Sequence, residues 1–127
     1  MKRLLLILVL LISIISCKKE TEDKTKVVEV KKPEPVVIEF GFKLNDYDVV
    51  QDTIVSGDNF GNILEKQNIG DKKVHEITER IKDSFNLRNI RIGKPYTMLR
   101  KKDKSKMLQV FIYQADIANF YVVDLRD

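Results

Sequence analysis

TIVSGDNFGNILEKQNI, residues 53–69, starts as an extended run rich in β-branched residues and passes through a Gly-Asp turn into a helical pattern. A second amphipathic segment follows, and IGKPYTML, residues 92–99, then opens another extended run. β-Branched runs bounded by turn residues favour strands, and apolar residues spaced three and four apart favour helices. The stretch 53–99 therefore predicts the order strand, helix, helix, strand, around which we expect the rest of the chain to be organised.

Two short helices are predicted within this stretch. Phe60, Ile63 and Leu64 form the apolar stripe of the first, and the Asp58 carboxylate is expected to accept the free amide protons of its first turn. Asp71 is the expected cap of the second helix. The apolar face of that helix carries Val74, Ile77, Ile81 and Phe85. Because neither helix is long enough to be stable alone, each must bury its stripe against strands.

The flanking segments predict further strands. Residues 36–42 form an extended apolar run, and residues 49–55 are strand-like. Residues 107–113 and 119–125 predict a β-hairpin, which extends the sheet as a meander with residues 96–100. The predicted fold class is therefore α+β, a βααβ unit extended by a C-terminal antiparallel β-hairpin.

The hairpin is apolar on both of its faces. Leu108, Val110 and Ile112 are expected to face one way and Phe111 the other, and a sheet of this kind needs cover on both faces. The two helices can cover only one face. Because the chain stops at Asp127, directly after an apolar strand, we expect a further domain or a partner to cover the other face.

The N-terminus resembles a bacterial lipoprotein signal. A short basic start precedes an apolar run at residues 4–15, which is short for a membrane span and typical of a signal-peptide core. The run ends Ile14-Ile15-Ser16-Cys17, which resembles the lipobox and implies cleavage after residue 16 and palmitate-type acylation of Cys17. The alternative is an ordinary hydrophobic N-terminal anchor. Because Cys17 is the sole cysteine, no internal disulfide is possible.

Residues 17–35 are predicted to be a disordered tether, because they are rich in Lys, Glu and Thr and lack apolar periodicity. Residues 36–127 then form the predicted folded domain, held by its lipid at a membrane of the cell envelope and facing the periplasm. The net charge is +4, and two of the basic residues lie in the segment expected to be removed. No basic patch interleaved with aromatics is present, so no nucleic-acid partner is predicted.

Residues 54–64, IVSGDNFGNIL, resemble the opening of a LysM domain, and IGKPY, residues 92–96, resembles its closing strand. The longer second helix, the inserted-looking residues 84–91 and the hairpin that follows resemble the N-terminal region of lysostaphin-like zinc metallopeptidases. These are cell-wall endopeptidases, and the related opacity-associated-protein module is similar. The likeness covers residues 40–127. Complete shielding of the 107–125 hairpin within this chain would contradict it.

The resemblance implies a glycan site on two loops, because LysM modules bind N-acetylglucosamine-containing glycan between the first strand–helix loop and the second helix–strand loop. The matching residues here are Gly57, Asp58, Asn59, Phe60, Ile90, Arg91 and Ile92. Several of them have an ordinary structural alternative: Gly57 as a turn residue, Asp58 as a cap and Phe60 as core.

The catalytic part of the metallopeptidase family is not predicted in this chain. Those enzymes bind zinc with a His-x-x-x-Asp pair and a later His-x-His motif, and zinc hydrolysis needs about three protein ligands. The chain has one histidine, His75, which we expect to be structural. No catalytic residue, metal or cofactor is predicted, and whether the chain belongs to an enzyme stays open.

Three functions remain open. The first is a non-catalytic envelope module that binds or positions itself on peptidoglycan. The second is a regulatory domain that docks on a lysostaphin-like catalytic domain, of which this chain would be a fragment. The third is a structural lipoprotein without a ligand.

Overall fold

The computed structural model describes residues 33–126. The compact folded unit begins at Glu34. Cys17, the predicted signal peptide and most of the predicted tether lie outside the described residues. Within the described range, no helix is both long enough and apolar enough to cross a membrane.

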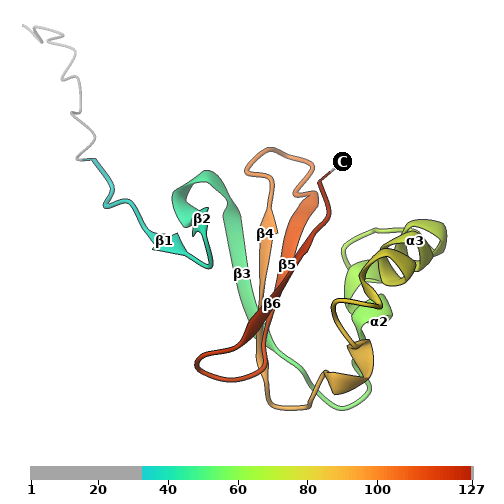
Figure 1. The fold of residues 1–127 in the computed structure, drawn as a ribbon. Helices are drawn as coiled ribbons and strands as arrows, with labels where there is room; N and C mark the ends of the chain where they lie inside the picture. The colour runs from blue at the N-terminus through green and yellow to red at the C-terminus, as the bar shows by residue number, and fades with distance from the viewer. Residues whose placement is uncertain (1–32, 127) are drawn as a thin grey trace, which may run out of the picture. The chain divides into compact units, whose positions relative to one another are not determined.

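A four-stranded antiparallel sheet forms the centre of the fold (Figure 1). Its strands follow chain order, and they are β3 (Asp48–Thr53), β4 (Pro95–Arg100), β5 (Leu108–Gln114) and β6 (Phe120–Asp124). The helices α2 (Phe60–Glu65) and α3 (Asp71–Ile81) and the 3₁₀ turn η2 (Leu87–Asn89) connect β3 to β4. The predicted order of strand, helix, helix and strand is confirmed, and so is the meander with the C-terminal hairpin.

The two helices cover one face of the sheet (Figure 1). The large core between them and the sheet comprises Ile54, Phe60, Ile63, Leu64, Ile77, Phe85, Tyr96, Met98, Leu108, Phe111, Tyr113, Val123 and Leu125. Phe111 lies at its centre, with its ring 5.3 Å from that of Phe60 and 5.4 Å from that of Tyr96. The predicted helical stripes are thus buried against the strands. The expected cap of α3 is wrong, because Asp71 is its first residue and Gly70 precedes it without a side-chain hydrogen bond.

A small N-terminal hairpin covers part of the other face. Residues 36–42, predicted as one run, instead fold back as β1 (Ile38–Glu39) and β2 (Phe42–Lys43), and η1 (Leu44–Asp46) follows. The turn residues Phe40 and Gly41 have φ of 53° and 83°. Two positive φ angles are what a two-residue type I′ turn requires. Gly41 adopts its angle without penalty, and Phe40 packs edge-to-face on Phe120 at 5.1 Å.

This hairpin gives the second face a core of its own. Leu99, Val110 and Ile112 are fully buried there, under partly buried residues that include Phe40, Phe42, Leu44 and Tyr47. The expectation that a further domain or partner must cover this face is therefore wrong for these three positions. Shielding is incomplete, however, because Phe120 and Val122 on the edge strand β6 remain exposed.

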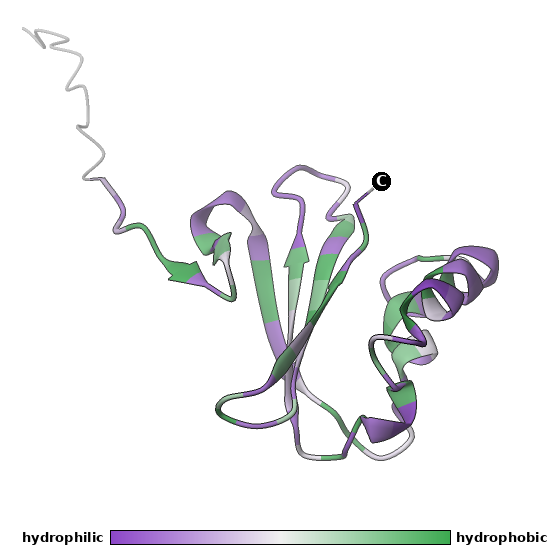
Figure 2. Ribbon diagram, viewed as in Figure 1, coloured by the Kyte–Doolittle hydropathy of each residue, from purple (hydrophilic) through white to green (hydrophobic). Residues whose placement is uncertain are grey.

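A β-bulge changes the expected facing of β5. The register shifts between Leu99, opposite Val110, and Arg100, opposite Leu108. Leu108 consequently joins the helix-side core, while Val110 and Ile112 belong to the hairpin-side core. The prediction that these three residues face one way is wrong for Leu108, because an extra residue reverses the alternation at that point. Figure 2 shows hydrophobic colour along β5, which, like β4, contributes residues to both cores.

Candidate functional site

The two loops that the resemblance singled out lie side by side. The Ile54 amide donates a hydrogen bond to the Lys94 carbonyl at 2.9 Å, and the Gly93 amide donates to the Ile54 carbonyl at 2.8 Å. These bonds continue the β3–β4 pairing past Thr53 and Pro95. Residues 55–59 and 90–93, which we call the paired-loop surface, therefore meet at one end of the sheet.

Four of the seven predicted glycan residues are engaged within the fold: Asp58, Asn59, Phe60 and Ile90. Phe60 is only 2% exposed, and Ile90 packs against the helix-side core. The Asp58 carboxylate accepts the Val55 amide at 3.1 Å and the Lys66 ammonium at 3.0 Å. These two bonds hold the pKa of Asp58 below its usual range. This carboxylate thus braces the turn before α2.

Asn59, not Asp58, caps α2. The Asn59 side-chain oxygen accepts the Asn62 amide at 2.9 Å, and Asn59 has extended backbone angles. The predicted cap was therefore wrong by one residue. The reason is that the turn places Asp58 against the backbone of Val55 rather than against the first turn of the helix.

The remaining predicted residues lie at the surface. Gly57 has φ of +90°, open space where a side chain would begin, and a carbonyl that accepts the Asn62 amide group at 3.3 Å. The Arg91 side chain is exposed, while its backbone amide donates to the Tyr113 hydroxyl at 3.0 Å. Ile92 is 68% exposed, and Val55 is exposed on the neighbouring loop. The paired-loop surface thus offers two aliphatic side chains beside the exposed side chain of Arg91.

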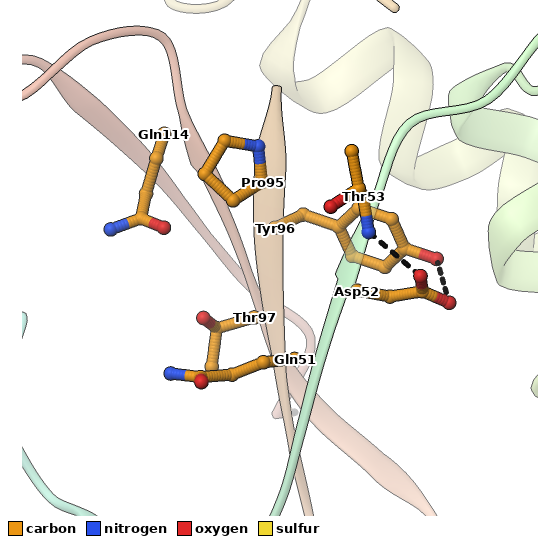
Figure 3. Close-up of a pocket in the computed structure, with 7 residues that line it drawn as sticks. All are labelled: Gln51, Asp52, Thr53, Pro95, Tyr96, Thr97 and Gln114. Atoms are coloured by element: carbon orange, nitrogen blue, oxygen red, sulfur yellow. Dashed lines mark hydrogen bonds between the residues drawn. The ribbon is translucent and has the colours of Figure 1, made fainter. Parts of the chain in front are cut away.

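A hollow that sequence reasoning missed lies on the sheet next to these loops. It has a volume of about 230 Å³ and is lined by Gln51, Asp52, Thr53, Pro95, Tyr96, Thr97 and Gln114. We call it the amide hollow. Figure 3 shows Gln51, Thr97 and Gln114 on one side of β4, while the Tyr96 ring reaches the other way toward Asp52. Since its residues come from β3, β4 and β5, no local sequence pattern could have indicated it.

The polar groups of the amide hollow are neutral on its open side. Within the described range, the side-chain amides of Gln51 and Gln114 form no hydrogen bond with other residues. The only carboxylate in the lining, that of Asp52, already accepts the Thr53 amide at 2.7 Å and the Tyr96 hydroxyl at 3.4 Å. Burial and the nearby Asp52 charge raise the pKa of Tyr96 to about 12, so its phenol keeps its proton at neutral pH.

A second hollow adjoins the first. It has a volume of about 310 Å³, and its lining is formed by Gly93, Lys94, Pro95, Gln114, Asp116 and Ile117. Pro95 and Gln114 belong to both hollows. The Asp116 carboxylate accepts the Asn119 side-chain amide at 2.8 Å and the Ala118 backbone amide at 2.8 Å, and these bonds lower its pKa. This hollow reaches from the sheet to Gly93 in the paired-loop surface.

Among residues 33–126, no cluster of three or more His, Cys, Asp or Glu side chains could hold a metal ion. His75 is exposed on α3.

Searches against protein-family models, curated proteins and solved structures returned no match to this chain.

Proposed function

We propose that this chain is a non-catalytic module of the bacterial cell envelope that binds peptidoglycan glycan strands. The observation that supports it is the paired-loop surface, where two loops meet through the backbone of Ile54 and leave the side chains of Val55, Ile92 and Arg91 exposed. Apolar side chains can pack on a sugar face, and backbone amides and short polar side chains can bond its hydroxyl and acetamido groups. The resemblance to LysM modules points to the same two loops.

Binding to isolated peptidoglycan tests this proposal. The full-length chain in detergent is expected to be retained on purified sacculi. Ile92→Ser is expected to weaken retention about 3- to 10-fold, because it removes an exposed aliphatic side chain that glycan binding would bury. Met107→Ser is the matched control, since Met107 is 53% exposed and lies beyond Arg100 at the opposite end of β4. Equal retention of both variants, or none for the natural chain, would contradict the proposal.

The proposal includes lipid attachment at Cys17, which would hold the module at the membrane and facing the periplasm. Several acyl chains on one residue anchor a protein stably, because each buried methylene contributes about 0.8 kcal/mol. Cys17→Ala is expected to abolish labelling of the chain by a clickable palmitate analogue in a bacterial host. Labelling that survives this change would indicate an uncleaved hydrophobic anchor instead.

Docking on a lysostaphin-like catalytic domain is a second candidate function. The observation that favours it is the exposed edge strand β6, where Phe120 and Val122 present apolar surface. The sequence-based argument for it is weakened, because Phe40, Phe42, Leu44 and Tyr47 already pack over Leu99, Val110 and Ile112. Co-purification of a zinc endopeptidase with the natural chain but not with Val122→Lys would support this candidate.

A further inference from the structure

We propose that the amide hollow and the hollow beside it form one groove that binds a neutral, N-acetylated glycan chain. This inference rests on the proposed function and names a site beyond the two loops. The two hollows share Pro95 and Gln114, and the second reaches Gly93. A ligand seated on the paired-loop surface can therefore continue along the ends of β4 and β5 onto the face of the sheet.

The hydrogen-bonding groups of this groove match a neutral ligand. Side-chain amides both donate and accept hydrogen bonds, so Gln51 and Gln114 can serve a partner rich in hydroxyl and acetamido groups, while Thr97, only 1% exposed, lies beneath them. The amides of Gln51 and Gln114 have no partner among the described residues, so binding need not break an existing bond. Asp52 and Asp116 are already engaged by internal donors. A cationic ligand would find no unengaged carboxylate in this lining, and the one basic side chain there, Lys94, lies near the Asp116 carboxylate.

The groove also has apolar surface at its rim. Phe120 pairs with Gln114 across β5 and β6 and remains 46% exposed. Its ring is held edge-on against Phe40 at 5.1 Å, which fixes its orientation. Ile117 is fully exposed in the adjoining loop, and Pro95 is exposed between the hollows. Rigid apolar faces beside amides suit a sugar ring, whose C–H faces are apolar and whose edges carry hydroxyls.

The position of the groove favours a glycan over an extended peptide. Peptides often bind sheets by adding a strand at an edge, where backbone groups are unpaired. The floor here is β4, which is already paired to β3 on one side and to β5 on the other. Recognition must therefore come from side chains. Each hollow is at or below the small end of the roughly 300–1,000 Å³ range of small-molecule pockets, so each can accept a single sugar unit but not a large cofactor.

The test uses soluble probes with the full-length chain in detergent. Chitotetraose, a neutral N-acetylated glycan, is expected to bind measurably by calorimetry or by NMR shifts at Gln51 and Gln114. The double substitution Q51A/Q114A is expected to weaken that binding about 10- to 30-fold, since it removes two hydrogen-bonding side chains. The matched control is Gln109→Ala, because Gln109 lies on β5 beside Leu108 and away from the groove.

The comparison probes separate the possible outcomes. Cellotetraose lacks acetamido groups. If it binds as tightly as chitotetraose, the inference is overturned. Binding of a peptidoglycan stem peptide with no binding of chitotetraose would overturn it as well. Loss of sacculus retention in Ile92→Ser but full chitotetraose binding by Q51A/Q114A would leave the proposed function standing and refute the groove. Chitotetraose binding that needs Gln51 and Gln114, with no sacculus retention, would support the groove and refute the proposed function.

Discussion

The two faces of the central sheet are covered in different ways. On one face α2 and α3 bury a large continuous core that spans all four strands. On the other, a hairpin of two-residue strands covers only Leu99, Val110 and Ile112, and the residues toward the Thr53–Pro95 end stay open. We therefore expect the helix-covered face to supply most of the stability, and the partly covered face is the one on which we propose that glycan binds.

The largest expected effect comes from the helix-covered face. Phe111→Ala removes a fully buried ring that contacts Phe60 and Tyr96, and it is expected to lower the free energy of unfolding by about 3–5 kcal/mol. Urea unfolding followed by circular dichroism measures this change. A loss below about 1 kcal/mol would show that this core is not the main source of stability.

The matching change on the hairpin-covered face is expected to cost less. Leu99 is as fully buried as Phe111, but its cluster contains only three buried residues. Leu99→Ala is therefore expected to lower the free energy of unfolding by about 2–3 kcal/mol, toward the low end for such substitutions, because the short hairpin can shift into the space. The same urea experiment applies. A cost above that of Phe111→Ala would reverse the ranking of the two faces.

The smallest expected effect concerns the turn of the N-terminal hairpin. Gly41→Ala places a side chain at φ of +83° and is expected to cost about 1 kcal/mol. Gly70→Ala is the control, because Gly70 has φ of −68° and open space around it. We expect Gly41→Ala also to loosen the cover over Leu99, which faster hydrogen exchange at β4 and β5 would report. Equal stability of the two variants would mean that the hairpin contributes little.

Sequence reasoning succeeded where the signal was local. The stripe of Phe60, Ile63 and Leu64 and the apolar runs around Met98 and Phe111 predicted the elements and their order. It failed where a contact distant in the chain selected the conformation. Phe40 has a positive φ and packs on Phe120, which is eighty residues away in sequence. The bulge that moves Leu108 to the helix side arises in the pairing of β5 with β4.

The candidate sites divide in the same way. The two loops of the paired-loop surface were predicted from the resemblance to LysM modules, which itself depends on two local turn signatures, Gly57-Asp58 and Gly93-Lys94-Pro95. The amide hollow was missed because Gln51, Thr97 and Gln114 are unremarkable polar residues in three separate strands. Only the register, which sets Gln51 opposite Thr97 and Thr97 opposite Ile112, brings them onto one surface.

The sequence by itself determined the local elements, because periodicity, turn residues and β-branching act over a few neighbouring positions. Tertiary structure alone decided which faces those elements cover, which residue caps α2 and where an open groove remains. The physical reason is that burial is a property of contacts between distant segments, and the same apolar run can be core, cover or exposed surface depending on what packs against it.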